Sequence, residues 1–425
     1  MKSRKIWIWV AVAAVAASEA RAEFRAGAAR RVITPDPLLP VSGGLGAPRP
    51  AKEKRGDLEV GAIVFENGGT RVAFVSLDLL GFPSVLGNRV RKAVSGIKPE
   101  NILIGATHTH SAPDTYAFPD GKGGHTGDLA YMDRVCKLAA EAIDEAVAKL
   151  APARLRVGGG EAKGKIAYNY YAPDLYDRRM SVLRFEGVDG KAIATLVNYA
   201  IHPEVLGNEV GILSPDLVGP LRDRVAEAGG GLCLFMNGAQ GGMITADNRD
   251  LSQPRDPLRA YWNDLRAWSE CERIGRLMAD EAARLIQDAP LDADPKVGCA
   301  GVDVAFPVES DLMWAVIVGS PLGYPRNADR TVTVRVALVD LGDARILTIP
   351  GEALPNIGFY LKRKMNGKQN MLFGLTNEAF GYILTKVDFK SFPRYDYVSR
   401  TSLGEMTGEI LIEKSLDLIA RTPRP

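Results

Sequence analysis

The sequence contains few residues of the types that mark several common classes of protein. Its 425 residues include only four cysteines and four histidines, and the formal net charge is +2. A net charge this small gives no indication of nucleic-acid binding, acidic tails or intrinsic disorder. We therefore expect no nucleic-acid partner.

The few cysteines, Cys136, Cys233, Cys271 and Cys299, are far apart in the sequence and form no C-x-x-C pair. In an oxidising compartment four cysteines allow three disulfide pairings. Three of them lie in helical or apolar strand patterns, where buried free thiols are at least as plausible as disulfide bridges. The pairing stays open, and we do not expect cysteine chemistry to carry the function.

Long hydrophobic runs are also missing, except at the start of the chain. Lys2, Arg4 and Lys5 precede the apolar run IWIWVAVAAVAA, and Ala20-Arg21-Ala22 has the pattern of a cleavage site. This run is too short to cross a bilayer comfortably. We predict that residues 1–22 are a signal peptide cleaved near Ala22, with a retained anchor as the alternative. The mature chain is then exported to the periplasm or secreted, without a transmembrane span.

Residues 23–425 show no internal repeat, low-complexity tract or linker, so we expect one large domain. Strand patterns such as 71–78 mix with helical patterns at 128–150 and 262–287, and glycines 158–160 are expected to break the chain. The fold class is therefore α/β, with α+β as the alternative. We expect a central mixed sheet flanked by helices.

Two of the four histidines follow one apolar strand pattern. Residues 102–104, Ile-Leu-Ile, lead into Thr107-His108-Thr109-His110. In an extended chain residues i and i+2 project to the same side, so His108 and His110 should face one place. The alternative is a solvated loop that contains two histidines by accident. His125, in a glycine-rich stretch, is interpreted as a surface residue.

Polar residues follow other strand patterns in the same way. His202 ends the apolar run 192–201, and Glu352 comes shortly after the run 345–349. Open α/β sheets usually place their sites at such strand ends. Two histidines and a carboxylate with an open position form a common catalytic zinc set, and imidazole suits zinc better than magnesium or calcium. Taken singly, His202 could be a core histidine and Glu352 a helix N-terminal carboxylate.

Several short motifs, taken in order, resemble one known family. The segments ATHTHSAPDTY, NYAIHP, NGAQGG, PGE and NEAFGYILT resemble the neutral, non-lysosomal ceramidases, and FRAGAARRVITP and AFVSLDLLG resemble the start of their catalytic domain. The resemblance covers nearly all of the mature chain. It implies that residues 23–425 form a neutral-ceramidase-like catalytic domain, without the carboxy-terminal immunoglobulin-like domain of the larger ceramidases.

The resemblance also implies roles for single residues. The zinc ligands would be His108, His202, Glu352 and Tyr382. His110 would lie beside the metal and polarise the scissile group. Tyr395 would support the oxyanion, with Tyr397 as a substitute because the interval from Tyr382 is about one residue longer than in the family.

Two parts of the family pattern are missing. Ile244, in the stretch GGMIT, stands where the ceramidases carry their proposed serine nucleophile, and Asn169-Tyr170-Tyr171 lacks the arginine of the family's NRSP segment. Zinc-activated water can replace a serine nucleophile, with His110 or Asp247 taking its proton. Thr245 is the alternative nucleophile.

These patterns predict an exported, zinc-dependent hydrolase that cleaves the amide bond of a small-molecule or lipid-like substrate. That substrate is expected to be an N-acyl sphingoid base or another N-acyl compound. One alternative is a metal-dependent hydrolase of a polar or carbohydrate-linked substrate. The other is a catalytically silent protein that binds a metal or a ligand. The oligomeric state stays open.

Overall fold

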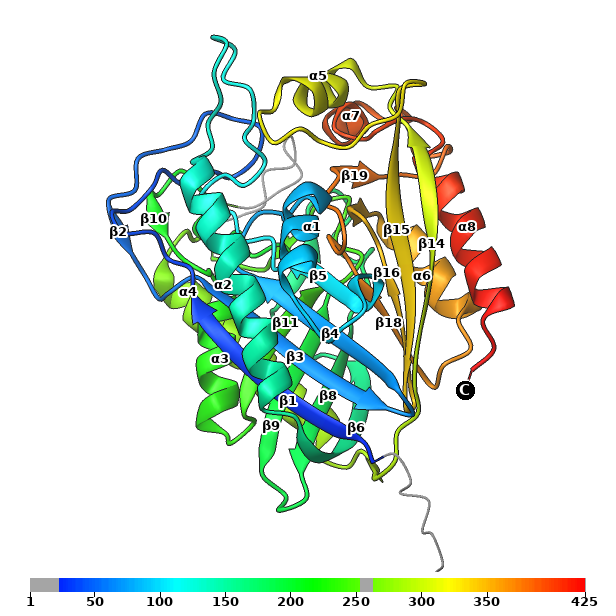
Figure 1. Cartoon of the computed structure of the whole chain (residues 1–425). Helices are drawn as coiled ribbons and strands as arrows, with labels where there is room; N and C mark the ends of the chain where they lie inside the picture. Colours follow the sequence, from blue (N-terminus) through cyan, green and yellow to red (C-terminus); the bar gives the residue numbers. More distant parts are fainter. Residues whose placement is uncertain (1–22, 253–262, 425) are drawn as a thin grey trace, which may run out of the picture.

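The computed structural model describes residues 23–252 and 263–424, and the predicted signal peptide lies outside them. Two β-sheets form the centre of the molecule, with helices on their outer sides (Figure 1). The larger sheet has nine strands, in the order β11-β9-β8-β6-β1-β3-β4-β5 with β13 beside β6. Its strands are β1 (Arg25–Val32), β3 (Glu59–Asn67), β4 (Thr70–Leu77), β5 (Ile102–Ala106), β6 (Ala151–Glu161), β8 (Arg179–Gly187), β9 (Ala192–Tyr199), β11 (Leu232–Asn237) and β13 (Leu291–Asp292).

The second sheet has four strands in the order β14-β15-β16-β18. They are β14 (Val297–Pro307), β15 (Thr331–Leu341), β16 (Ala344–Thr348) and β18 (Gln369–Phe373). The described residues also form three two-stranded sheets: β2 (Glu53–Lys54) with β10 (Ile212–Leu213), β7 (Ala167–Asn169) with β12 (Ile244–Ala246), and β17 (Glu352–Ala353) with β19 (Tyr382–Ile383). Parallel pairs, such as β4 with β5 and β9 with β11, occur among antiparallel ones.

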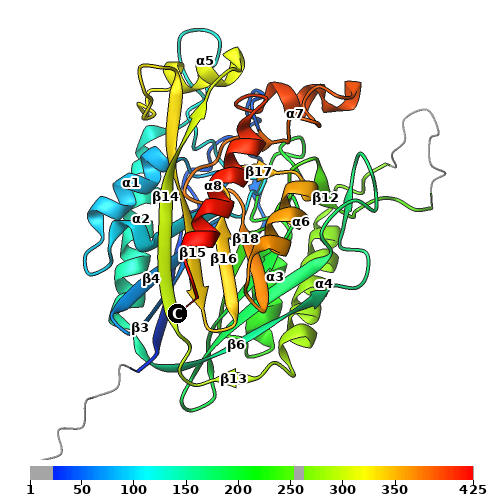
Figure 2. The same cartoon turned by 90° about the vertical axis from the view of Figure 1, so that its right-hand side faces the viewer.

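The α-helices of the described residues are α1 (Ser84–Ala93), α2 (Leu129–Ala148), α3 (Val218–Glu227), α4 (Trp268–Ile286), α5 (Asp311–Gly319), α6 (Pro355–Lys364), α7 (Asp396–Arg400) and α8 (Thr407–Arg421). Most of them cover the outer faces of the two sheets, as Figure 2 shows for α6 and α8 on the second sheet, whereas α5 and α7 lie together at one end of the molecule. Side chains alternate along each strand. In β4, Phe74 faces the second sheet and Val75 faces the layer of α2, while in β15 Val339 faces the large sheet and Leu338 faces α6 and α8. The layers therefore run helix, sheet, sheet, helix.

The predicted α/β class with a central mixed sheet flanked by helices is confirmed. The sheet is divided into two packed layers, which the sequence patterns did not separate. In the part of the chain that the structure describes, no helix combines the length and apolar character needed to cross a membrane. All four cysteines are free thiols, and Cys136, Cys233 and Cys271 are buried.

Two predictions about local structure were wrong. Glycines 158–160 do not break the chain but lie inside β6, where helix α4 packs so closely that a Cβ atom on Gly158 would lie 2.4 Å from the carbonyl oxygen of Leu285. The helix predicted from residue 262 begins at Trp268. Residues 263–265 instead lie along the chain at 248–250, where the amide of Leu265 donates to the carbonyl of Asn248.

Candidate metal centre and its cavity

The candidate metal ligands come together because several strands end at one place. His108 follows β5, His202 follows β9, and Glu352 begins β17. The parallel pairing of β17 with β19 places Glu352 directly opposite Tyr382. The structure therefore brings all four of the ligand candidates into one region.

His108 and His110 converge, but not by the extended geometry that their spacing suggests. His108 has a φ of 72°, in the left-handed region that side chains rarely adopt. Its amide donates to the carbonyl of Leu79, which bends the chain away from the strand. The two rings meet edge to face with centroids 4.7 Å apart. A strained backbone at a buried histidine is typical of a functional site.

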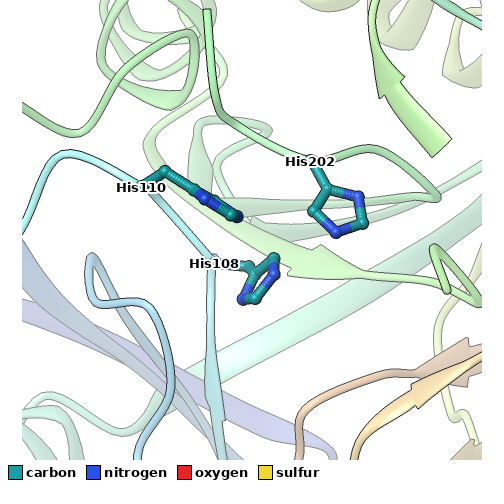
Figure 3. Close-up of side chains that lie close together, drawn as sticks. All are labelled: His108, His110 and His202. Carbon is teal, nitrogen blue, oxygen red and sulfur yellow. The ribbon is translucent and has the colours of Figure 1, made fainter. Parts of the chain in front are cut away.

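The nitrogen atoms of three histidines form a compact cluster (Figure 3). One ring nitrogen from each of His108, His110 and His202 lies within 4.8 Å of the others. Nε2 of His202 lies 3.1 Å and Nε2 of His108 lies 3.6 Å from Oε2 of Glu352. Two imidazoles and one carboxylate thus point at a common centre.

Backbone carbonyl groups orient two of these rings. Nδ1 of His108 lies 2.5 Å from the carbonyl oxygen of Leu80, and Nδ1 of His202 lies 2.7 Å from that of Ile244. Because each Nδ1–H is donated to a carbonyl, each ring is turned so that its Nε2 faces Glu352. Metal-binding histidines are commonly held in this way. The donors fit a borderline cation such as zinc.

The electrostatics of the cluster depend on burial and on Glu352. Burial lowers the pKa of His108 to about 3. Burial also acts to lower the pKa of His202, but the hydrogen bond with Glu352 and the charges of Glu204 and Glu352 outweigh it and raise the pKa to about 9. Burial acts to raise the pKa of Glu352, and the two histidines lower it below its ordinary value. In the metal-free protein His202 and Glu352 therefore form a buried ion pair.

His110 has a different environment from the other two histidines. Its Nδ1 lies 3.8 Å from Oε2 of Glu204, and its Nε2 is buried without a hydrogen-bond partner. Burial lowers its pKa to about 3, and the positive charge of His202 contributes. A neutral imidazole with a free nitrogen beside the cluster can accept a proton or bind a metal.

Of the three tyrosines predicted near the site, Tyr382 and Tyr397 lie beside the cluster and Tyr395 does not. The buried hydroxyl of Tyr382 donates to the sulfur atom of Met243 at 3.2 Å, and burial and the nearby Glu352 raise its pKa. Tyr397 lines the cavity beside the cluster, and burial and Glu352 raise its pKa to about 12. Tyr395 instead packs against the rings of Tyr171 and Phe392 and is not among the described residues that line the cavity. The geometry thus favours the substitute, Tyr397, over Tyr395.

Asp247 and Thr245 are also absent from the lining of the cavity. Both carboxylate oxygens of Asp247 accept hydrogen bonds from Arg249 at 2.7 Å. Thr245 lies in β12, where it pairs with Tyr168 and forms a bridge with His202. The neighbouring Ile244, in place of the serine, contributes its carbonyl group to orient His202.

The cluster opens into a cavity of about 100 Å³ with largely apolar walls. Leu45, Leu80, Phe118, Val316 and Ile317 line it together with His108, His110 and Glu352. Tyr116 and Glu378, which were not singled out from the sequence, contribute polar groups to the wall. Glu378 lies four residues before Tyr382 in the motif NEAFGYILT, and this closeness is the one feature of the sequence that could have indicated its place in the site. In the described part of the chain no lysine or arginine lines the cavity.

Comparisons with known proteins agree with the motifs. The neutral ceramidase of Pseudomonas aeruginosa is 26% identical over an alignment of 168 residues, and the match covers 35% of this chain and 25% of that protein. The crystal structure of neutral ceramidase from Pseudomonas aeruginosa matches with a TM-score of 0.74 and 17% identity, over 95% of this chain and 76% of that one. The chain has the neutral ceramidase fold. No protein-family model matches.

A second solved structure, a ceramidase complexed with C2, matches with a TM-score of 0.73 and 16% identity, again over 95% of this chain and 76% of that one. The predicted resemblance to the neutral ceramidases is therefore confirmed. At this identity the structural likeness shows the fold alone. The matched sequence spans a quarter of the length of the ceramidase found by sequence.

Proposed function

We propose that the chain is a zinc-dependent hydrolase of the ceramidase type that cleaves the amide bond of an N-acyl compound. The observation that carries this proposal is the convergence of Nε2 of His108, Nε2 of His202 and the carboxylate of Glu352 beside an apolar cavity. Tyr382, opposite Glu352, is the fourth proposed ligand. Zinc, when bound, polarises a carbonyl oxygen and lowers the pKa of water to about 7.

The residues of the chain provide the remaining parts of the reaction. His110 holds a free, buried Nε2 beside the cluster and accepts the proton of the attacking water. The hydroxyl of Tyr397 donates to the oxygen of the scissile carbonyl as negative charge develops there. The C–N bond breaks, a C–O bond forms, and the proton passes to the leaving amine. Neither Thr245 nor Asp247 is needed.

The walls of the cavity support a lipid-like substrate. An acyl chain would bury its methylene groups against Leu80, Phe118 and Val316. Because no lysine or arginine among the described residues lines the cavity, we expect uncharged substrates to bind better than anionic ones. A polar or carbohydrate-linked substrate would leave many of its hydroxyl groups without partners on these walls.

We further propose export before the enzyme acts, supported by the basic start and the Ala20-Arg21-Ala22 pattern. Expression in a bacterial host, followed by mass measurement of the periplasmic and secreted protein, tests this. A mature chain that begins near Glu23 is expected. An unprocessed chain in the cytoplasm would contradict export.

The main experiment uses residues 23–425, stripped of metal with a chelator and reloaded with zinc. Short-chain N-acyl derivatives of long-chain amines are supplied, and release of the free amine is measured. We expect hydrolysis with zinc and none without it. His108→Ala and His202→Ala should abolish hydrolysis while circular dichroism shows an intact fold. Stoichiometric zinc binding without hydrolysis of amides or esters would favour a silent binding protein.

A further inference from the structure

One carboxyl group in the wall of the cavity has no part in the metal cluster. Glu378 lines the cavity and is only 4% exposed. The other carboxyl group among the described lining residues, that of Glu352, pairs with His202. Glu378 forms no ion pair with a described residue, and the guanidinium group of Arg91, whose charge acts on it, donates instead to Oδ1 of Asn377 at 2.7 Å. A buried carboxyl group without a paired cation is costly, which makes it a candidate for binding a ligand.

The chain holds this carboxyl group in place from one side. Oε1 of Glu378 accepts a hydrogen bond from the amide of Ala379 at 2.9 Å, and Ser84, the first residue of α1, also hydrogen-bonds to the carboxyl group. Burial raises the pKa of Glu378, although these hydrogen bonds and the charge of Arg91 act to lower it. A carboxylate can accept about four hydrogen bonds. Glu378 is therefore oriented by its neighbours and can still accept from a ligand in the cavity.

A second polar group in the same wall has no partner. The hydroxyl group of Tyr116 lines the cavity and makes no hydrogen bond with a described residue. A Cβ atom on Gly81 would collide with this hydroxyl group and would lie 2.8 Å from Cβ of Ala379, so the glycine leaves the room that the hydroxyl group needs. Burial raises the pKa of Tyr116, and the charges of Glu352 and Glu378 contribute. The hydroxyl group thus lies in the part of the wall that joins the cluster to Glu378.

The polar groups of this wall select the kind of ligand that fits. A ligand group that donates a hydrogen bond satisfies Glu378, and one that also accepts satisfies Tyr116. An anionic group would meet Glu378 without a lysine or arginine in the described lining to offset the repulsion. The apolar walls at Leu45 and Val316 suit an acyl chain. A hydrogen-bond donor in the substrate is therefore expected on the amine part.

We propose that Glu378 and Tyr116 form a subsite that binds a hydrogen-bond-donating group, an ammonium or a hydroxyl group, on the amine part of the substrate. The carboxylate of Glu378 accepts from this group, and the hydroxyl of Tyr116 donates to the oxygen atom of a substrate hydroxyl. The subsite determines specificity and takes no part in breaking the amide bond. The choice of an amide as the ligand rests on the proposed function, but binding can be measured without hydrolysis.

Four amides of hexanoic acid that differ only at the end of the amine part test the subsite. The amines are diaminopropane, aminopropanol, butylamine and aminobutyrate, which end in an ammonium, a hydroxyl, a methyl and a carboxylate group. Calorimetry measures their binding to metal-free residues 23–425, where no hydrolysis is expected. The ammonium compound should bind at least about tenfold and the hydroxyl compound about fivefold more tightly than the methyl compound. The carboxylate compound should bind most weakly.

Two variants and a matched control assign these differences to single residues. Glu378→Gln removes the charge and keeps an oxygen atom for the local hydrogen bonds. It should weaken binding of the ammonium compound about tenfold, strengthen that of the carboxylate compound, and leave the methyl compound within about twofold. Tyr116→Phe keeps the ring stacked on Phe118 and should weaken binding of the hydroxyl compound about fivefold. Glu272→Gln, which removes an exposed carboxylate on α4 outside the cavity, should change none of them.

Equal binding of the ammonium, hydroxyl and methyl compounds to the wild type would overturn the proposal. An equal loss for all four compounds in Glu378→Gln would also overturn it, because Glu378 would then only support α1. If circular dichroism shows that Glu378→Gln does not fold, the order of the four compounds in the wild type and the effect of Tyr116→Phe decide. The expected order of binding, without hydrolysis of any of these amides by the zinc-loaded protein, would support the subsite and contradict the proposed function.

Discussion

The hydroxyl group of Tyr382 donates a hydrogen bond to the sulfur atom of Met243 at 3.2 Å. Met243 lies in the stretch GGMIT, one residue before the isoleucine that replaces the expected serine. Its φ is 66°, so this stretch turns sharply beneath the cluster. The segment that lacks a nucleophile therefore still contacts the fourth proposed metal ligand.

This contact predicts different effects of Met243→Leu in the two metal states. In the metal-free protein the buried hydroxyl loses its acceptor, and we expect the free energy of unfolding to fall by about 1 kcal/mol. With zinc bound to Tyr382, the hydroxyl no longer needs the sulfur atom, and the difference should disappear. Chemical denaturation with and without zinc measures both. Met406→Leu, on the surface, is the control. An equal loss in both states would argue against Tyr382 as a ligand.

The two tyrosines near the carboxyl end should behave differently. Tyr397→Phe removes a hydroxyl at the cavity wall and should lower kcat by about 10²-fold with little change in KM. Tyr395→Phe keeps the ring contact with Tyr171, and its kcat should stay within about twofold of the wild type. Steady-state kinetics of amide hydrolysis compares them. A larger loss of kcat with Tyr395→Phe than with Tyr397→Phe would instead support Tyr395 as the residue that stabilises the oxyanion.

The motifs predicted the composition of the cluster better than its geometry. His108, His202 and Glu352 each follow a strand pattern, so their convergence could be expected from strand ends alone. The left-handed turn at His108 depends on hydrogen bonds to residues 77–79, which local spacing does not encode. Tyr382 had no signal of its own apart from the family resemblance, because its place depends on the register of β17 with β19.

Long-range packing also explains the errors in the predicted fold. Gly158 resembles a chain break in sequence, yet it lies in a strand because only a glycine fits beneath α4. The second sheet was not separated from the first, since both consist of buried apolar strands with the same period. Tyr395 and Tyr397 lie two residues apart near a short helix, and only the fold decides which of them reaches the cavity.

Thr245 provides a test of the nucleophile. Its side chain lies outside the cavity lining, so Thr245→Ala and Thr245→Val should leave kcat within about twofold of the wild type. His110→Ala should lower kcat by about 10²-fold or more, because it removes the proposed proton acceptor. Both are measured with one amide substrate at saturating zinc. A large loss with Thr245→Val would instead support a threonine nucleophile.

The close packing of α4 on β6 predicts a change in stability. In Gly158→Ala the new methyl group would meet the carbonyl of Leu285 at 2.4 Å, and we expect the free energy of unfolding to fall by about 1–3 kcal/mol. Gly46→Ala is the matched control, because a Cβ atom there has no neighbour within 4 Å. Urea denaturation of the two variants is compared. Equal stabilities would mean that α4 moves freely away from the strand.

The ion pair of His202 and Glu352 predicts a dependence on pH that zinc removes. The pKa of His202 is raised to about 9 in the folded metal-free protein, above the ordinary value of 6.5. The pair therefore stabilises the folded protein fully below pH 6.5, and this stabilisation is lost as the pH rises through 9. Between pH 7 and pH 9 we expect the metal-free protein to lose about 2 kcal/mol of stability, whereas His202→Gln should show no such loss.

Zinc must displace the same proton, because it binds neutral imidazole. At pH 7 each binding event should therefore release at least one proton, and the apparent affinity should rise at least tenfold between pH 7 and pH 8. Calorimetry in two buffers of different ionisation enthalpy counts the protons, and competition with a chelator measures the affinity. His108 and His110 do not contribute in this range, since burial lowers both of their pKa values to about 3. Zinc binding without proton release at pH 7 would contradict a charged His202 and the ion pair with it.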